Sequence, residues 1–135
     1  MCIRDSPERV RALNTLGVLY TSLGQSGAAT AALEHACELA RRLGIATSEA
    51  IARGQLGALA LARGDLAAAR GHFGAQELLS TKLGDRHGRA RSLTYLAEVA
   101  LEAGQASTAR DLARHARAVA MEAQPALEIL SLIHI

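Results

Sequence analysis

The feature that most constrains the fold is a set of small residues and leucines that returns every 40 residues. Gly24, Gly64 and Gly104 keep this spacing, and a leucine followed by a small residue precedes each glycine at a fixed distance. Self-similarity at a period of roughly 20–50 residues is typical of repeat architectures, in which each unit packs against its neighbours. The positions in this register, which we expect to pack the repeats together, are Leu16, Gly17, Tyr20, Gly24, Ala29, Leu56, Gly57, Gly64, Ala69, Phe73, Leu96, Ala97, Gly104 and Ala109.

Each copy of the repeat divides into two segments with helical periodicity. In the first copy, apolar or small residues recur at the helical period of about 3.6 residues, at Leu13, Leu16, Gly17 and Tyr20 and then at Ala29, Leu33, Ala36, Ala40 and Leu43. Gly44 and Gly84 are suited to helix C-caps, because glycine adopts the left-handed conformation without a Cβ penalty. Asp85, Ser26 and Ser107 are suited to helix starts, where a side-chain oxygen accepts a free backbone N–H. The pattern predicts six helices in three pairs.

The composition agrees with a helical chain. Half of the residues are apolar, which suffices for a folded core, but aromatic residues make up only 2% and Trp is absent. The core must therefore be built from Leu and Ala, and the small alanines bring helix backbones close together. We predict an all-α protein, an α-solenoid of three helix-turn-helix repeats with about six to seven antiparallel helices. The repeats are predicted over 7–44, 45–84 and 85–124, with 125–129 the start of a truncated next helix.

The residues of the first copy resemble a known repeat family. Leu13-x-x-Leu16-Gly17-x-x-Tyr20, followed by Ala29-x-x-x-Leu33, is similar to the tetratricopeptide repeat (TPR) pattern. The second copy matches at Leu56, Gly57, Ala69 and Phe73, and the third matches less closely. The resemblance covers most of the chain and implies a right-handed superhelix.

The chain departs from the usual TPR pattern in two respects. Its period is 40 residues, where the usual repeat has about 34, and the usual tryptophan is replaced by Leu13, Arg53 and Leu93. The 40-residue form resembles the helical arrays of large bacterial ATP-dependent signalling and transcriptional regulators. HEAT-like helical repeats share this length, but the Leu-Gly and Ala phasing favours the TPR interpretation.

Stacked helical pairs leave a concave face, lined by the first helix of each pair, that can hold a peptide or an amphipathic helix. Candidate partner-binding residues on that face are Arg11, Asn14, Val18, Thr21, Ile51, Ala58, Leu61, Arg91, Thr94, Glu98 and Leu101. Alternatively, Ile51 and Leu61 pack against neighbouring helices. The predicted function is a protein-protein interaction scaffold in a larger regulatory protein. The alternative is a structural array that self-associates through uncapped ends, and a more distant one is a fragment that supplies a lid or scaffold to an enzyme.

The sequence offers no catalytic, metal or cofactor chemistry that we can identify. His35 and Cys37 point to different faces of one helix, whereas metal ligands are expected three or four residues apart. Cys37 stands in register with the charged Glu77 and Arg117, which predicts an at least half-exposed thiol. The glycines punctuate helices and form no phosphate-binding motif. We therefore predict that the chain is no enzyme and carries no cofactor.

Charge and hydropathy narrow the partners and the location. The net charge is +2 with the cations spread along the chain, and the basic stretch over 86–91 lacks interleaved aromatic residues for base stacking. We therefore expect a protein or peptide partner and no direct contact with nucleic acid. No apolar run approaches the roughly 20 residues that span a membrane, and no signal-peptide pattern opens the chain. The expected location is the cytoplasm.

The two terminal hexapeptides, MCIRDS over 1–6 and LSLIHI over 130–135, differ in character from the rest. Back-translated, one DNA element read in opposite directions accounts for both, and this element resembles the end sequence of transposase-based sequencing adapters. We expect both hexapeptides to be adapter-derived, with Ser6 sharing its codon with the natural sequence. Such segments are excluded from fold reasoning.

Overall fold

The computed structural model describes residues 6–122, which form six α-helices and no strand. The helices are α1 (Pro7–Ser22), α2 (Ser26–Leu43), α3 (Ala46–Ala62), α4 (Leu66–Leu83), α5 (Arg86–Glu102) and α6 (Ala106–Glu122). The predicted all-α class is confirmed. The expected truncated helix over 125–129 and the hexapeptides, apart from Ser6, lie outside the described residues. Ser6 is the N-cap of α1, where its Oγ accepts a hydrogen bond from the Arg9 backbone N–H at 3.3 Å.

A glycine with a positive φ lies in the connection between every pair of consecutive described helices. Gly44 and Gly84 are the C-caps of α2 and α4 with φ of 72° and 68°, as their positions predict. Their left-handed backbone is strained for any residue with a Cβ. Asp85 is the N-cap of α5 and accepts from the Gly88 N–H at 3.0 Å, as predicted. Ser26 and Ser107 lie at helix starts, as the first residue of α2 and the second residue of α6, but the N-cap of α2 is Gln25 and makes no side-chain cap bond.

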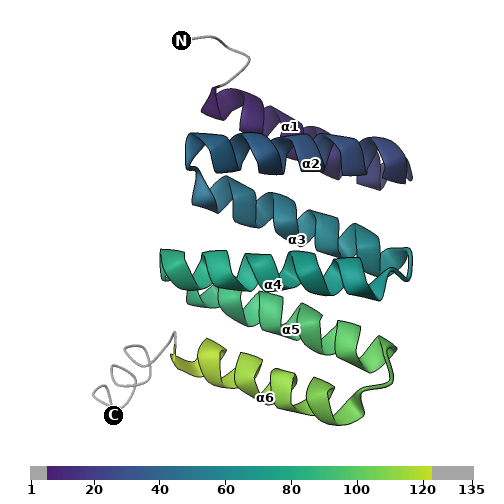
Figure 1. Cartoon of the computed structure of the whole chain (residues 1–135). Coiled ribbons are helices and arrows are strands. Elements are labelled where there is room, and N and C mark those ends of the chain that lie inside the picture. The colour runs from purple at the N-terminus through teal and green to yellow at the C-terminus, as the bar shows by residue number, and fades with distance from the viewer. Residues whose placement is uncertain (1–5, 123–135) are drawn as a thin grey trace, which may run out of the picture.

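The helices follow one another as successive rungs from α1 to α6 (Figure 1). Each helix packs mainly against the next one in the chain, and α1 also contacts α3. The buried apolar residues accordingly form a series of clusters along the stack and no single central core. This one-dimensional packing is that of a helical solenoid, which confirms the predicted architecture.

Within each pair, the first helix offers a small residue to a side chain of the second. Gly17 faces Leu33, and a Cβ added at Gly17 would lie 2.4 Å from the Leu33 Cγ. Gly57 faces the fully buried Phe73 ring in the same way, at 2.7 Å from its Cε1. The third pair has alanine at both equivalent positions, 97 and 113. Small and large side chains are therefore matched separately in each pair, which lets the helices approach closely.

Leu16 departs from the expected role in packing. It is 41% exposed, whereas Leu56, at the equivalent position of the second pair, is 4% exposed. The reason is that α2 packs against Leu56, while within residues 6–122 no helix precedes α1 to cover Leu16. Leu19 and Leu23 on the same helix are exposed as well, at 51% and 65%.

Candidate functional site

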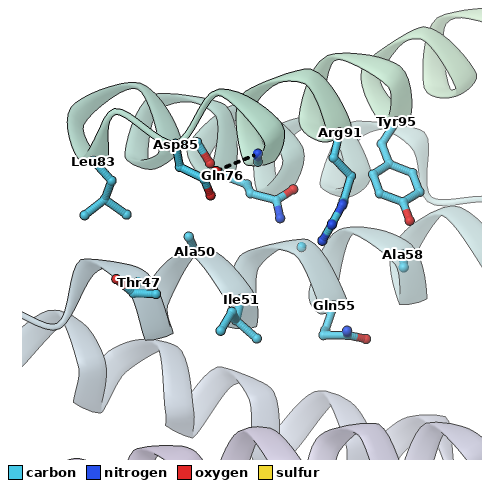
Figure 2. Close-up of a pocket in the computed structure, with 13 residues that line it drawn as sticks. Thr47, Ala50, Ile51, Gln55, Ala58, Gln76, Leu83, Asp85, Arg91 and Tyr95 are labelled. Carbon is cyan, nitrogen blue, oxygen red and sulfur yellow. Dashed lines mark hydrogen bonds between the residues drawn. The ribbon is translucent and has the colours of Figure 1, made fainter. Parts of the chain in front are cut away.

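A cavity of about 320 Å³ lies between α3, α4 and α5. Figure 2 shows side chains from α3 on one side and from α4 and α5 on the other, facing the same space. The cavity is lined by Thr47, Ala50, Ile51, Gly54, Gln55, Ala58, Gln76, Ser80, Leu83, Asp85, Gly88, Arg91 and Tyr95. We call this cavity the α3–α5 groove.

The floor of the groove depends on glycine in the helices beside it. A Cβ at Gly54 would lie 2.4 Å from the Gln76 Nε2, and a Cβ at Gly88 would lie 2.8 Å from the Ser80 Oγ. Two polar side chains of α4 therefore occupy space that larger residues on α3 and α5 would fill. The result is a polar floor beneath an otherwise mixed surface.

Gln76 is the polar group of the groove that lacks a partner. Its side chain is 8% exposed, and its Oε1 accepts no hydrogen bond from the described residues. A buried acceptor without a donor costs about 1–3 kcal/mol, so the Gln76 amide is an unfavourable polar group within the lining of the groove. In Figure 2 the Gln76 amide points into the space between α3 and α5.

The walls of the groove combine one cation, Arg91, and one carboxylate, Asp85, with apolar side chains. Arg91 extends from α5 toward α3 (Figure 2), is exposed, and forms no ion pair within residues 6–122. Asp85 is occupied as the N-cap of α5. Ile51 and Leu83 remain 48% and 43% exposed. This arrangement can bind a segment with an apolar and a negatively charged group, but it positions no nucleophile or acid-base pair.

Three of the predicted partner-binding residues, Ile51, Ala58 and Arg91, line this groove together. Other predicted residues are exposed but do not line it, namely Arg11, Val18, Thr21, Thr94, Glu98 and Leu101. Leu61 is partly buried against the cluster of Ala60, Ala69, Phe73 and Val99. For Leu61 the alternative interpretation, packing against neighbouring helices, therefore describes its surroundings.

Asn14 is the predicted groove residue that the structure removes from the surface. It is 9% exposed, and its Nδ2 donates a hydrogen bond to the Ser48 backbone O at 3.3 Å. Because this bond reaches from α1 to the first turn of α3, the amide joins two helix pairs and is not available to a partner. The expectation for Asn14 as an exposed groove residue is therefore wrong.

Several groove residues were not predicted, although the repeat register contains a signal for some of them. Gln55 and Tyr95 occupy the same position of the repeat as Thr15. This position contributes to the groove in addition to the positions of Ile51 and Ala58. Gln76 and Ser80 replace alanines of the other two copies, at 36 and 116 and at 40 and 120. A polar residue where the other copies have alanine is a sign that the local packing differs.

Two ionic clusters lie between the helices and outside the groove. In the first, Arg53 lies 4.0 Å from Glu49 and 3.3 Å from the His72 Nδ1. Burial lowers the pKa of His72, and the Arg53 guanidinium lowers it further. In the second, the Arg89 Nε donates to the Glu77 Oε1 at 3.0 Å, and another guanidinium nitrogen lies 3.3 Å from the His115 Nε2. These groups, which are partly buried apart from the exposed His115, link neighbouring helices.

Cys37 differs from its expected exposure. It is 7% exposed, because the α2–α3 packing covers it, and burial raises the pKa of its thiol. Within residues 6–122 there is no group of three or more His, Cys, Asp or Glu residues placed to hold a metal ion. None of the described helices is long and apolar enough to cross a membrane.

The fold defines a helical repeat protein with an open groove on its surface. No family model matches the sequence, and no curated protein matches it. Among solved structures, the chain is similar to the TPR domain of Arabidopsis FLU, with a TM-score of 0.77 and 20% identity. The similarity covers 82% of this chain and 93% of the FLU domain. The chain therefore has a TPR-like fold.

Proposed function

We propose that this chain is a non-catalytic protein-interaction scaffold that binds a partner segment in the α3–α5 groove. The observation that carries the proposal is an open cavity lined by exposed apolar side chains, Ile51 and Leu83, and by an exposed cation, Arg91, without an ion pair in the described part of the chain. We further propose that the chain is a segment of a larger bacterial signalling or transcriptional regulatory protein in the cytoplasm.

The size of the groove favours a short contact. A cavity of about 320 Å³ is at the lower end of the roughly 300–1,000 Å³ of small-molecule sites. It has room for one or two side chains of an extended peptide or of an amphipathic helix lying across the face. Ile51 and Leu83 would contact apolar side chains, and Arg91 would contact a carboxylate.

A pair of arginine substitutions on α3 tests the groove. Ala58 is exposed and lines the cavity, whereas Ala62 is exposed on the same helix but outside it. Peptides selected against the chain by display should bind the Ala58→Arg variant roughly tenfold or more weakly, a loss of about 1.4 kcal/mol, and should bind Ala62→Arg as well as the original chain. If both variants bind the selected peptides unchanged, the groove is not the binding site.

A second candidate function is a self-associating array. The observation in its favour is the exposed apolar face of α1, formed by Leu16, Leu19 and Leu23 at 41%, 51% and 65% exposure. Contiguous exposed apolar side chains often mark an interaction surface. Sedimentation velocity over a range of concentrations tests this candidate: association that is lost in a Leu19→Ser variant supports it, and a chain that stays monomeric at all concentrations contradicts it.

A further inference from the structure

The outer face of α6 lies at the end of the described stack, and the two internal junctions between pairs show what such a face contacts. At the α4–α5 junction, Glu77 of α4 accepts from Arg89 of α5 at 3.0 Å, with the two side chains only 20% and 30% exposed. At the α2–α3 junction, Cys37 of α2 is buried, and the charges of Arg53 and Glu49 of α3 both act on its thiol. The position of α6 in the same register is Arg117.

At one position the charge of the α6 face is unlike that of the other two. Arg117 stands where the earlier copies have Cys37 and Glu77, whereas Arg110 stands where α2 has Thr30 and α4 has Arg70. Thr30 accepts a hydrogen bond at 3.3 Å from Arg63, the C-cap of α3, so this position also faces the end of the following helix. Arg110 and Arg117 are exposed and form no ion pair within residues 6–122.

The α6 face is also less bulky than its counterparts. Ala113 occupies the position of Leu33 and Phe73, which are fully buried in the first two pairs. A helix packed here would have to supply the missing volume itself. Charge and shape therefore specify the same type of ligand, one with a carboxylate near its start and large apolar side chains in the middle.

We propose that the outer face of α6 binds an amphipathic helix of a partner protein that carries a carboxylate in its first turn, opposite Arg117. The helix would lie antiparallel to α6, as α5 lies on α4, and its carboxylate would take the position of Arg89 with the charges reversed. The partly buried Glu77–Arg89 pair is the geometric precedent for this contact. The proposal concerns a surface distinct from the α3–α5 groove and does not depend on it.

A second copy of the chain is a poor occupant of this face. The first helix of a second copy, stacked end to end, would place Arg9 in the register of Arg89 and thus opposite Arg117. Two like charges in a partly buried contact repel each other and oppose this arrangement. The α1 and α6 faces are therefore mismatched in charge, although the apolar α1 face remains free for other contacts.

A charge-swap experiment with a peptide of known sequence tests the proposal. The probe is an acetylated peptide of residues 46–62, the α3 sequence, which carries Glu49 in the register of Arg89. Fluorescence anisotropy should show that the full chain binds this peptide roughly fivefold more tightly than its Glu49→Arg variant. The Arg117→Glu chain should reverse the preference, and high salt should reduce it.

Arg114→Glu is the matched control, because it makes the same change in net charge at an exposed α6 position outside the proposed contact. Its register equivalent Glu34 is exposed and has no hydrogen bond or ion pair to α3. If Arg114→Glu alters the preference as much as Arg117→Glu does, or if the two peptides bind equally well, the proposal is wrong.

If neither peptide binds measurably, a carboxylate can instead be introduced into the first helix of the chain itself. A second copy of the chain then presents this carboxylate to Arg117. In sedimentation velocity, an Arg9→Glu chain should associate more strongly than the original chain, because its first helix then carries a carboxylate opposite Arg117. The Arg9→Glu, Arg117→Glu double variant should lose this added association. If Arg9→Glu causes no added association, or the double variant retains it, the proposal is overturned.

Discussion

The contact between Gly57 and Phe73 gives the sharpest test of the packing. A Gly57→Ala Cβ would lie 2.7, 2.8 and 2.9 Å from three atoms of the Phe73 ring. The ring is fully buried and stacks on Tyr95 with centroids 4.7 Å apart, so it has little freedom to move. Overpacking of this kind costs about 1–3 kcal/mol, and the higher helix propensity of alanine offsets about 1 kcal/mol of that cost. We expect a net loss of roughly 0–2 kcal/mol in the free energy of unfolding.

Gly74→Ala is the matched control for this substitution. Gly74 lies inside α4, and a Cβ added there would have nothing within 4 Å. This variant should gain about 0.5–1 kcal/mol from helix propensity alone. Urea denaturation followed by circular dichroism should therefore place Gly57→Ala roughly 1–3 kcal/mol below Gly74→Ala. If both variants are stabilised equally, the close approach of α3 and α4 at Gly57 is not as described.

Three further predictions concern the core, one turn and one ionic cluster. Phe73→Ala should cost about 3–5 kcal/mol in the free energy of unfolding, because it leaves a cavity and removes the Tyr95 stack; denaturant titration would show this, and a cost below about 1 kcal/mol would contradict the burial. Gly84→Ala should lower the melting temperature through a strain of about 1–2 kcal/mol at its φ of 68°, and an unchanged melting temperature would argue against a left-handed cap. Because burial and Arg53 lower the pKa of folded His72, the unfolded chain binds a proton more readily, and stability is lost as the pH falls through about 6.5. Urea melts across this range should be less pH-dependent for His72→Gln; an identical pH dependence would exclude this role.

The sequence predicts the fold well because its period and its small residues reflect contacts that occur within and between adjacent units. Gly44 and Gly84 end helices as their local pattern predicts, since a cap depends only on nearby backbone. Leu16 and Cys37 were placed incorrectly because exposure depends on whether another helix covers the position. The position of a residue within the repeat does not say whether a neighbouring helix covers it. Equivalent positions of different copies also cease to be equivalent at the end of the stack.

The groove could be predicted only in part. Ile51, Ala58 and Arg91 follow from helical periodicity on the first helix of each pair. Gln76 could not be assigned from its own helix, because its position in the floor depends on Gly54 of the facing helix. Residues whose environment is set by a compensating change elsewhere require the three-dimensional packing to be known.

The separate matching of small and large side chains in each pair limits how this protein can be rearranged. If α6 replaced α2, an alanine would lie against Gly17 and leave a void. If α4 replaced α6, a phenylalanine ring would press onto Ala97. Moving a complete hairpin keeps both members of the match together. The unit that duplication or engineering can transfer intact is therefore the two-helix hairpin, while single helices are not interchangeable despite their common sequence phase.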